Sequence, residues 1–474
     1  MVALAVLYVT LDSSAPLEPS KVRAVAPSLA VDWQEVGAEA TGILQGLLAI
    51  RSVNPPGAEE PAARYLAKIC EREGIEHQVI ETAPGRALLM ARLSGKRRTG
   101  ALCLTNHLDV VPPQADEWSD PSLAFSGKIV DGRIYGRGAL DMKGFAVMQL
   151  MALVVAKRAK LTLERDLVYL ALPDEEAGGR QGAWWVCEQR PELLDGITCM
   201  WNEGGVGVTD LGGMVRPVFA LMHAERGALW LSFRARGPSG HGSSAPPGSA
   251  PGRLLEALER LFDEQPSMRL GPITRRQFAT MADAADFPSS FFLRRAGNPL
   301  LRPLLDRTFK KDRFLRAVTR NTRSLTVLSA GEKVNVIPPL AEARVDIRLL
   351  PGVRPEDMRA RLEQRLAGLD IEIEVLHSQE ASASPVGTPL FDIIRGTIER
   401  LHPDAVVAPL LSPGGTDSAA FRSVGIDCYG LIPALFTREE MKGFHGADEH
   451  IRVEALTAGA RATFEAAIGY SQRP

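Results

Sequence analysis

The chain has 474 residues, of which 45% are hydrophobic and 24% are charged, so it is long enough for two or three globular domains. Its 55 Lys and Arg residues nearly balance 57 Asp and Glu residues. The resulting net charge of −2 argues against nucleic acid or an anionic membrane as a partner and favours a small molecule or a short peptide.

No apolar run is long enough to span a membrane, and the five scattered cysteines are expected to be reduced thiols. Residues 1–30 are expected to be a disordered lead-in or a weak signal-like segment, because 2–9 are apolar and several Pro residues follow. No Lys or Arg precedes the apolar run and Asp12 closes it, which is atypical of a secretory signal. We therefore expect a cytoplasmic protein, with export as the alternative if the run does act as a signal.

Residues 31–225 alternate between helical and strand patterns. Apolar spacing predicts helices at 33–50, 62–72, 142–159 and 182–190, and strands at 77–80, 87–93, 101–105, 166–172 and 197–201. The run Lys96-Arg97-Arg98 is expected to form a turn before the third strand. Strands that alternate with helices predict a mostly parallel sheet covered on both faces, as in the α/β fold class.

Residues 226–380 have a different pattern. Strands are predicted at 229–235, 324–329, 341–350 and 371–376, and helices at 253–264 and 356–366. This β-α-β-β-α-β order predicts a ferredoxin-like α+β domain inserted into the larger one. Residues 267–323 form a longer, less regular insert, whose six large apolar residues are expected to pack in a core rather than line a pocket: Phe287, Phe291, Phe292, Leu293, Leu300 and Leu301. The α/β pattern resumes at 381–474.

Several carboxylates and two histidines follow apolar runs of the outer domain. They are His107, Asp109, Asp141, Glu175, Glu176, Glu203 and, much later, His445. Imidazole nitrogens and carboxylate oxygens are the ligands of a zinc-type site, and a carboxylate can be shared between two ions. Asp109 is placed to orient His107, and Glu175 is free to take a proton from metal-bound water. Each residue alone is more often an ordinary polar contact, but their combination favours a dinuclear metal site.

A set of short motifs then occurs in order along nearly the whole chain. The motifs are His107-Leu-Asp109-Val-Val-Pro, Gly136-Arg-Gly-Ala-Leu-Asp141-Met-Lys-Gly, Asp174-Glu175-Glu176, Asn202-Glu203-Gly-Gly, Gly240-His241-Gly-Ser-Ser-Ala-Pro, Asn335-Val-Ile-Pro, Asp346-Ile-Arg348, Gly414-Gly-Thr416-Asp417 and Phe444-His445-Gly-Ala-Asp-Glu. With them the chain resembles the co-catalytic zinc peptidase family of glutamate carboxypeptidase, aminoacylase, succinyl-diaminopimelate desuccinylase and carboxypeptidase S.

The resemblance implies a role for each ligand. Asp141 would bridge two Zn²⁺ ions per chain, with Co²⁺ or Mn²⁺ as substitutes. His107 and Glu203 would complete one ion, and Glu176 and His445 the other. Glu175, the first Glu of the Asp174-Glu175-Glu176 motif, would be the general base.

The resemblance also implies that 226–380 is a lid and dimerisation domain. His241 would stabilise the tetrahedral oxyanion, in the family often in the active site of the other subunit. Asn335 and Arg348 would meet the substrate from the lid, with the Arg348 fork on a free carboxylate. Gly415 and Thr416 would line the substrate pocket. Without the resemblance, His241 and Arg348 read as surface residues.

The residues and the resemblance together predict a di-zinc amidohydrolase or metallopeptidase, homodimeric through its lid. We expect it to cleave N-acyl amino acids, or the C-terminal residue of short peptides, by metal-bound water with Glu175 as base. Alternatives are a desuccinylase or deacetylase of amino-acid biosynthesis, a dipeptidase, a non-catalytic binding protein of the same fold, and a single-metal exopeptidase of another fold. Residues 377–385 contain no Arg, so glutamate specificity is not inferred.

Overall fold

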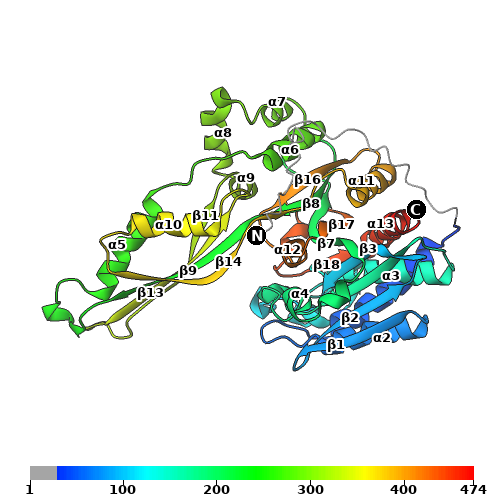
Figure 1. Ribbon diagram of the computed structural model, residues 1–474, viewed down its shortest axis with the longest axis horizontal. Helices are drawn as coiled ribbons and strands as arrows, with labels where there is room; N and C mark the ends of the chain where they lie inside the picture. Colours follow the sequence, from blue (N-terminus) through cyan, green and yellow to red (C-terminus); the bar gives the residue numbers. More distant parts are fainter. Residues whose placement is uncertain (1–28, 474) are drawn as a thin grey trace, which may run out of the picture.

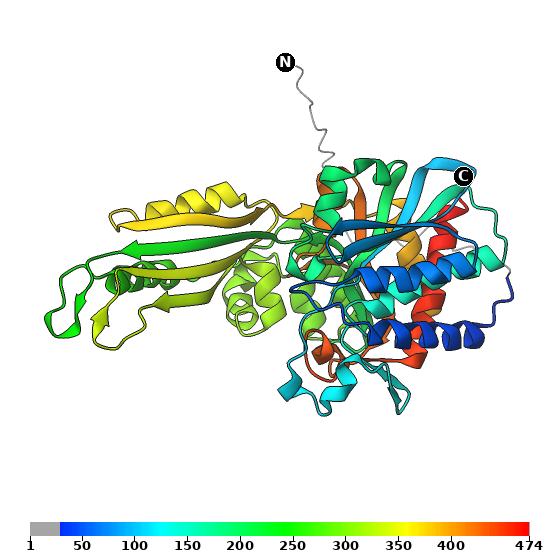
Figure 2. The same ribbon diagram turned by 90° about the horizontal axis from the view of Figure 1, so that it is seen from below.

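The computed structural model describes residues 29–473, so most of the expected lead-in lies outside the described residues. Figure 1 shows a large α/β body and a narrower arm of strands and helices that projects from it. Figure 2, turned by 90°, shows the same arm extending away from the body. Within residues 29–473, no helix is both long enough and apolar enough to cross a membrane.

The body is built on a nine-stranded sheet in the order β1-β2-β6-β3-β7-β17-β8-β15, with β16 paired to β8. The inner pairs β3–β6, β3–β7 and β7–β17 are parallel, which confirms the predicted α/β fold with a mostly parallel centre. The strands are β1 (Glu76–Ala83), β2 (Arg86–Leu93), β3 (Arg97–His107), β6 (Arg165–Leu172), β7 (Ile197–Val208), β8 (Val218–Glu225), β15 (Ser382–Ala383), β16 (Val406–Ser412) and β17 (Asp427–Phe436).

Helices cover both faces of this sheet because successive residues of each inner strand are apolar. In β6, Leu167 and Tyr169 belong to the core on one face, and Val168 and Leu170 to the core on the other. The first core lies against α1 (Trp33–Ala49), α2 (Glu60–Arg72), α3 (Lys143–Arg158), α11 (Pro389–Leu401) and α13 (Val453–Ser471). The second lies against α4 (Ala183–Gln189) and α12 (Ser418–Ser423). A small three-stranded sheet joins β4 (Ile129–Val130), β5 (Arg133–Tyr135) and β18 (His450–Arg452).

The projecting arm contains a separate antiparallel sheet in the order β11-β13-β9-β14. Its elements follow the chain order β9 (Gly227–Arg236), α5 (Ala250–Asp263), β11 (Thr322–Ala330), β13 (Leu340–Leu349), α10 (Pro355–Arg365) and β14 (Ile371–Gln379). Both the chain order and the strand order are those of a ferredoxin-like domain. At the end of β9 farthest from the body, β10 (Gly240–His241) pairs with β12 (Val336–Ile337). We call this arm the lid.

Residues 267–323, which we call the helical insert, are more regular than predicted. They form α6 (Pro272–Met281), α7 (Ser289–Arg294), α8 (Arg302–Phe309) and α9 (Arg313–Thr319). These helices are short and often begin at Pro, so no long apolar period marks them in the sequence. The insert shares its core with β8 and β16 of the body, through residues such as Phe278, Val218 and Ala408.

The expectation that all six large apolar residues of the insert pack in a core is only half right. Phe292, Leu293 and Leu301 pack against the core that the insert shares with the body. Phe287 and Leu300 are 81% and 88% exposed, and Phe291 also lies at the surface.

Two local predictions in the body are wrong. The basic turn at 96–98 is not a separate turn, because β3 already begins at Arg97. The strand predicted at 197–201 continues to Val208, so Glu203 lies within a strand rather than in a loop after one. Glycines at 204, 205 and 207 hide this continuation, since glycine is rare in strands.

We expect Phe278→Ala to destabilise the body by about 3–5 kcal/mol, because Phe278 is fully buried between α6 and the sheet and packs edge-on against Phe309. Calorimetric unfolding measures the effect. Phe287→Ala is the matched control in the same insert and is expected to change little, since that ring is exposed. Equal midpoints for the two variants would show that the insert is not part of the core of the body.

Candidate metal centre

His107 is the last residue of β3, and Asp109 follows it at the carboxyl edge of the sheet. Both side chains are buried. The imidazole Nδ1 lies 3.0 Å from the backbone carbonyl of Asp109 and 3.4 Å from its Oδ1. Since both partners are acceptors, the Nδ1–H donates and the lone pair of Nε2 is left for a metal ion.

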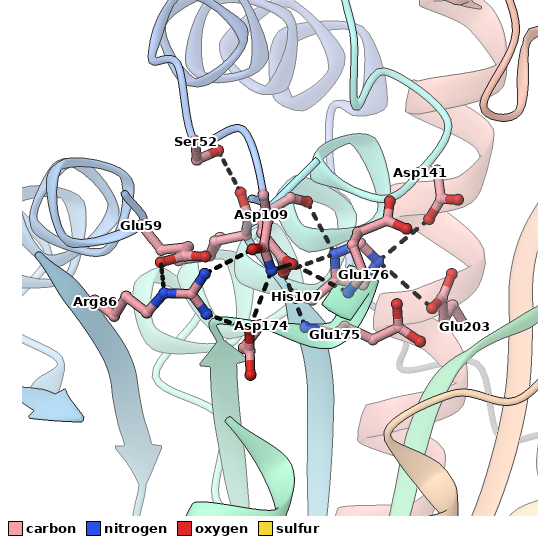
Figure 3. Close-up of polar contacts among 12 residues, drawn as sticks. Ser52, Glu59, Arg86, His107, Asp109, Asp141, Asp174, Glu175, Glu176 and Glu203 are labelled. Atoms are coloured by element: carbon pink, nitrogen blue, oxygen red, sulfur yellow. Dashed lines mark hydrogen bonds and ion pairs between the residues drawn. The ribbon is translucent and has the colours of Figure 1, made fainter. Parts of the chain in front are cut away.

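Asp141 lies between two imidazoles. Its Oδ1 is 3.2 Å from the Nε2 of His107, and its Oδ2 is 3.0 Å from the Nε2 of His445. Glu203 Oε1 lies 3.5 Å from the same His107 nitrogen, and Glu176 Oε2 lies 3.2 Å from the same His445 nitrogen. Each imidazole therefore meets one oxygen of Asp141 and one oxygen of a glutamate. Figure 3 shows His107, Asp141, Glu176 and Glu203 converging.

The loop that carries Asp141 is held by a residue to which the sequence assigned no role. Glu449 is completely buried and accepts hydrogen bonds from the backbone N–H groups of Gly138 (3.0 Å), Leu140 (2.7 Å) and Asp141 (3.0 Å). Arg137 Nη1 donates to the same carboxylate at 2.7 Å. In the sequence, Glu449 is marked only as the last residue of the motif that begins at Phe444. Glu449 thus positions Asp141 through its backbone.

Glu175 and Glu176 form a tight turn after β6. Their backbone N–H groups donate to Asp109, at 3.2 Å to Oδ1 and 3.1 Å to Oδ2. Asp174, which begins the turn, adopts a left-handed φ of 76°, which Asp tolerates better than most residues. Asp109 therefore orients both the His107 ring and the turn that carries two further carboxylates.

A buried polar network supports Asp109 from the side opposite His107. Asn54 donates to Asp109 Oδ2 at 2.8 Å and to Asp174 at 3.1 Å, and Arg86 binds Asn54 at 2.6 Å and also Asp174. Glu59 lies 3.8 Å from the Arg86 guanidinium, and burial raises its pKa to about 7. Figure 3 shows this network beside the metal-ligand cluster. None of the sequence motifs contains Asn54, Glu59 or Arg86.

The carboxylates of the cluster repel one another in a buried site. Burial, together with the charge of Glu203, raises the pKa of Glu175 well above its ordinary value. Burial also raises the pKa of Glu203 to about 7, with the Asp141 charge adding to the effect. Asp417, which the sequence analysis placed only in a motif, is also buried. Burial raises its pKa, and the nearby charges of Asp109 and Glu203 add to the effect.

The pKa values of the two histidines are also raised, which for an imidazole favours the charged form. Burial opposes that charge on His107, but its hydrogen bonds to Asp109, Asp141 and Glu203 outweigh burial. Hydrogen bonds to Asp141 and Glu176 raise the pKa of His445 to about 10. Burial opposes ionisation of Asp141, but its hydrogen bonds with His107 and His445 outweigh that effect and lower its pKa. The cluster therefore favours positive charge next to Asp141 on both sides.

This donor set fits divalent cations. Ligand atoms of His107, Asp141 and Glu176 lie within 4.8 Å of one another, as do those of His107, Glu175 and Glu203. Glu176 Oε1 is buried without a hydrogen-bond partner among the described residues. Imidazole nitrogen and carboxylate oxygen are the usual ligands of zinc, and a buried group of carboxylates needs cations to remain ionised. The residues can therefore hold metal.

The lid residues are not brought to this cluster within one chain. His241 and Asn335 lie on β10 and in the segment before β12, where the Gly242 N–H donates to the Asn335 carbonyl at 2.9 Å. Both side chains are exposed. Arg348 lies near the body end of the lid sheet, paired with Asp346 at 2.9 Å and over the Trp230 ring at 6.0 Å. Among the described residues, none of the three contacts a predicted metal ligand.

Gly415 and Thr416 lie in the loop between β16 and α12. Gly415 is exposed. The Thr416 hydroxyl donates to Glu225, a completely buried carboxylate that Arg422 also binds at 3.0 Å. The Thr416 side chain therefore supports the loop, and the backbone around Gly415 remains accessible.

Residues 103–468 match the family described as Peptidase family M20/M25/M40. N-fatty-acyl-amino acid synthase/hydrolase PM20D1 from Homo sapiens is 30% identical over 369 residues, which cover 76% of this chain and 72% of that protein. Aminoacylase-1 from Sus scrofa is 27% identical over 427 residues, 87% of this chain and 90% of that protein. The crystal structure of the M20 family metallo-carboxypeptidase Sso-CP2 from Sulfolobus solfataricus shares the fold, with a TM-score of 0.72 at 20% identity over 91% of this chain and 99% of that one.

Zn²⁺ is expected to stabilise protein that has been treated with a chelator, by about 2.7 kcal/mol at a free concentration one hundred times the Kd. Thermal unfolding measures the effect.

Asp141→Asn removes one of the two anionic oxygens that face the histidines and should lower the bound metal from about two ions per chain to one or fewer. Elemental analysis measures the metal content. Asp195→Asn, at an exposed position, is the matched control. Equal metal content in both variants would contradict the site.

Proposed function

The chain belongs to peptidase family M20/M25/M40, and from this premise we propose that it hydrolyses the amide bond of N-acyl amino acids or releases the C-terminal residue of short peptides. Membership makes the protein a metallopeptidase or amidohydrolase, rather than a binding protein that only shares the fold. The names of PM20D1 and aminoacylase-1 support an N-acyl amino acid as the substrate.

The position of Asp141 is the observation that carries the proposal. Its two oxygens face His107 and His445 from opposite sides. We propose that Asp141 would be shared by two Zn²⁺ ions, that His107 and Glu203 would help to hold one, and that Glu176 and His445 would help to hold the other. Co²⁺ or Mn²⁺ would be accepted by the same oxygen and nitrogen ligands. Bound there, two such ions supply polarisation of the substrate carbonyl and acidification of water.

Glu175 is proposed as the general base. Its neighbours among the ligands are His107 and Glu203, and its backbone is fixed by Asp109. A raised pKa suits a carboxylate that takes a proton from the attacking water and returns it to the leaving nitrogen. Asp109 is proposed to act through His107 and the turn, by holding both in place.

The amino-acid half of the substrate is proposed to lie on the lid side. Arg348 carries a fork-shaped donor group that suits a free carboxylate, and Asp346 and Trp230 already orient it. Asn335 and the backbone near Gly415 would supply further hydrogen bonds. Thr416 would contribute by holding the loop, because its hydroxyl is already engaged with Glu225.

His241 is proposed to act in the active site of a second copy. It lies near the end of β9 that points away from the body, so the lid of one chain does not bring it to its own metal ligands. The edge strand β11 supports a homodimer through the lid, because Leu325, Val327 and Leu328 are 42%, 41% and 55% exposed. In the partner's site, His241 would donate to the developing oxyanion.

Glu175→Ala is expected to retain metal and to lose turnover by about 10²–10⁴-fold, because it removes the proposed base without removing a ligand. The assay is a hydrolysis panel of N-acetyl and N-succinyl amino acids and dipeptides with Zn²⁺ present. Glu188→Ala, at an exposed position on α4, should behave as the wild type. Near-normal hydrolysis by metal-loaded Glu175→Ala would exclude the assignment.

Mixing two inactive variants tests the role of His241 in the second subunit. His241→Ala and Glu175→Ala chains that exchange subunits form heterodimers with one complete site, so about a quarter of the wild-type activity should return. Activity is measured before and after exchange, and light scattering gives the oligomeric state. A mixture that stays inactive despite exchange would place His241 outside the partner's site.

A further inference from the structure

A cavity of about 500 Å³ opens directly from the metal ligands. Asp141 and Glu203 line one end of it, and Gln277, Met281 and Phe314 of the helical insert line the other. This volume lies within the range of small-molecule sites, about 300–1,000 Å³. A group attached to a carbonyl at the metal centre can therefore enter the cavity.

The walls of the cavity are apolar. Strands β7, β8, β16 and β17 contribute Val206, Val218, Leu410 and Ile432 among others. Of the described residues that line the cavity, Arg438 is the only charged one besides the two metal ligands. The buried Gln277 is already engaged, since its Oε1 accepts from the Leu411 N–H at 3.2 Å. A polar ligand would lose its hydrogen bonds to water there without replacing them. The chemistry of the walls therefore selects an aliphatic or aromatic group.

The helical insert holds its part of the cavity rigidly. Phe278 of α6 and Phe309 of α8 are buried in the core that the insert shares with β8 and β16. Asp312 caps α9, accepting from the Leu315 N–H at 2.8 Å, and this places half-buried Phe314 on the cavity wall. The cavity is therefore present before any substrate binds.

We propose that this cavity binds the straight aliphatic acyl chain of an N-acyl amino acid, so that the enzyme prefers medium or long acyl chains to acetyl. This inference rests on the proposed function. The four-stranded lid sheet, α5 and α10 contribute no residue to the cavity lining in the described chain. If the carboxylate half of the substrate lies toward the lid, the acyl half is the part that faces the cavity.

The test measures kcat/KM for N-acetyl-, N-butanoyl-, N-octanoyl- and N-dodecanoyl-phenylalanine. We expect a rise of about fourfold per methylene, equivalent to about 0.8 kcal/mol, until the cavity is full. Phe314→Asp places a charge on the wall and should reduce the dodecanoyl-to-acetyl ratio at least about tenfold. Phe287→Asp, at an exposed position of the same insert, should leave the series unchanged.

A second variant and a binding measurement keep the proposal testable if Phe314→Asp fails to fold. Val208→Trp fills the cavity from the end of β7 and should shorten the preferred chain, whereas Val215→Trp, at an exposed position outside the lining, should not. Calorimetric titration of metal-free protein should show N-dodecanoyl-phenylalanine binding at least about a hundredfold more tightly than the N-acetyl form. This readout does not depend on turnover.

Different results separate the two proposals. Hydrolysis of the N-acyl series without dependence on chain length would overturn the acyl assignment and leave the proposed function standing. If Phe314→Asp changed selectivity in a series of N-acetyl amino acids but not in the acyl series, the cavity would bind the amino-acid side chain instead. Absence of hydrolysis for every N-acyl amino acid by metal-loaded enzyme would overturn the acyl assignment, and absence of peptide hydrolysis as well would overturn the proposed function.

Discussion

Crowded carboxylates at a buried sheet edge are the constraint on which the catalytic body depends. Glu175, Glu203 and Asp417 have raised pKa values because burial and neighbouring negative charge oppose their ionisation. A cluster of buried carboxylates is stable only when cations balance its negative charge and when hydrogen bonds hold the carboxylates in place against their mutual repulsion. Positive charge comes from the two imidazoles that flank Asp141. Divalent metal ions, which suit this set of ligands, would supply more.

Two buried carboxylates that accept backbone hydrogen bonds, Asp109 and Glu449, hold the ligand loops in place. Asp109 receives the N–H groups of Glu175 and Glu176, and Glu449 receives three N–H groups of the loop that ends at Asp141. Each acceptor is completely buried and is itself bound by a cationic or amide side chain. The ligand positions are therefore set by the backbone of two loops, which is stiffer than a set of long side chains.

The lid and the helical insert meet the body in different ways, which explains how one site can combine general chemistry with a particular substrate. The lid has a hydrophobic core of its own, and its far end carries the β10–β12 pair with His241. The insert has no separate core, because its helices pack on β8 and β16. The lid is therefore a separately packed unit, whereas the insert forms part of the wall of the cavity beside the metal ligands.

The sequence by itself determined the features that short stretches encode: the α/β class, the ferredoxin-like order, and the motifs that contain His107, Asp141, Glu176 and His445. These are local, because a strand or a motif is read from adjacent residues. It did not reveal Glu449, Asn54 or Arg86 as supports, since their partners lie far away along the chain. Tertiary structure alone decided where the short insert helices pack, how Glu203 is held within β7, and that an apolar cavity adjoins the metal ligands, because each depends on surfaces that only folding brings together.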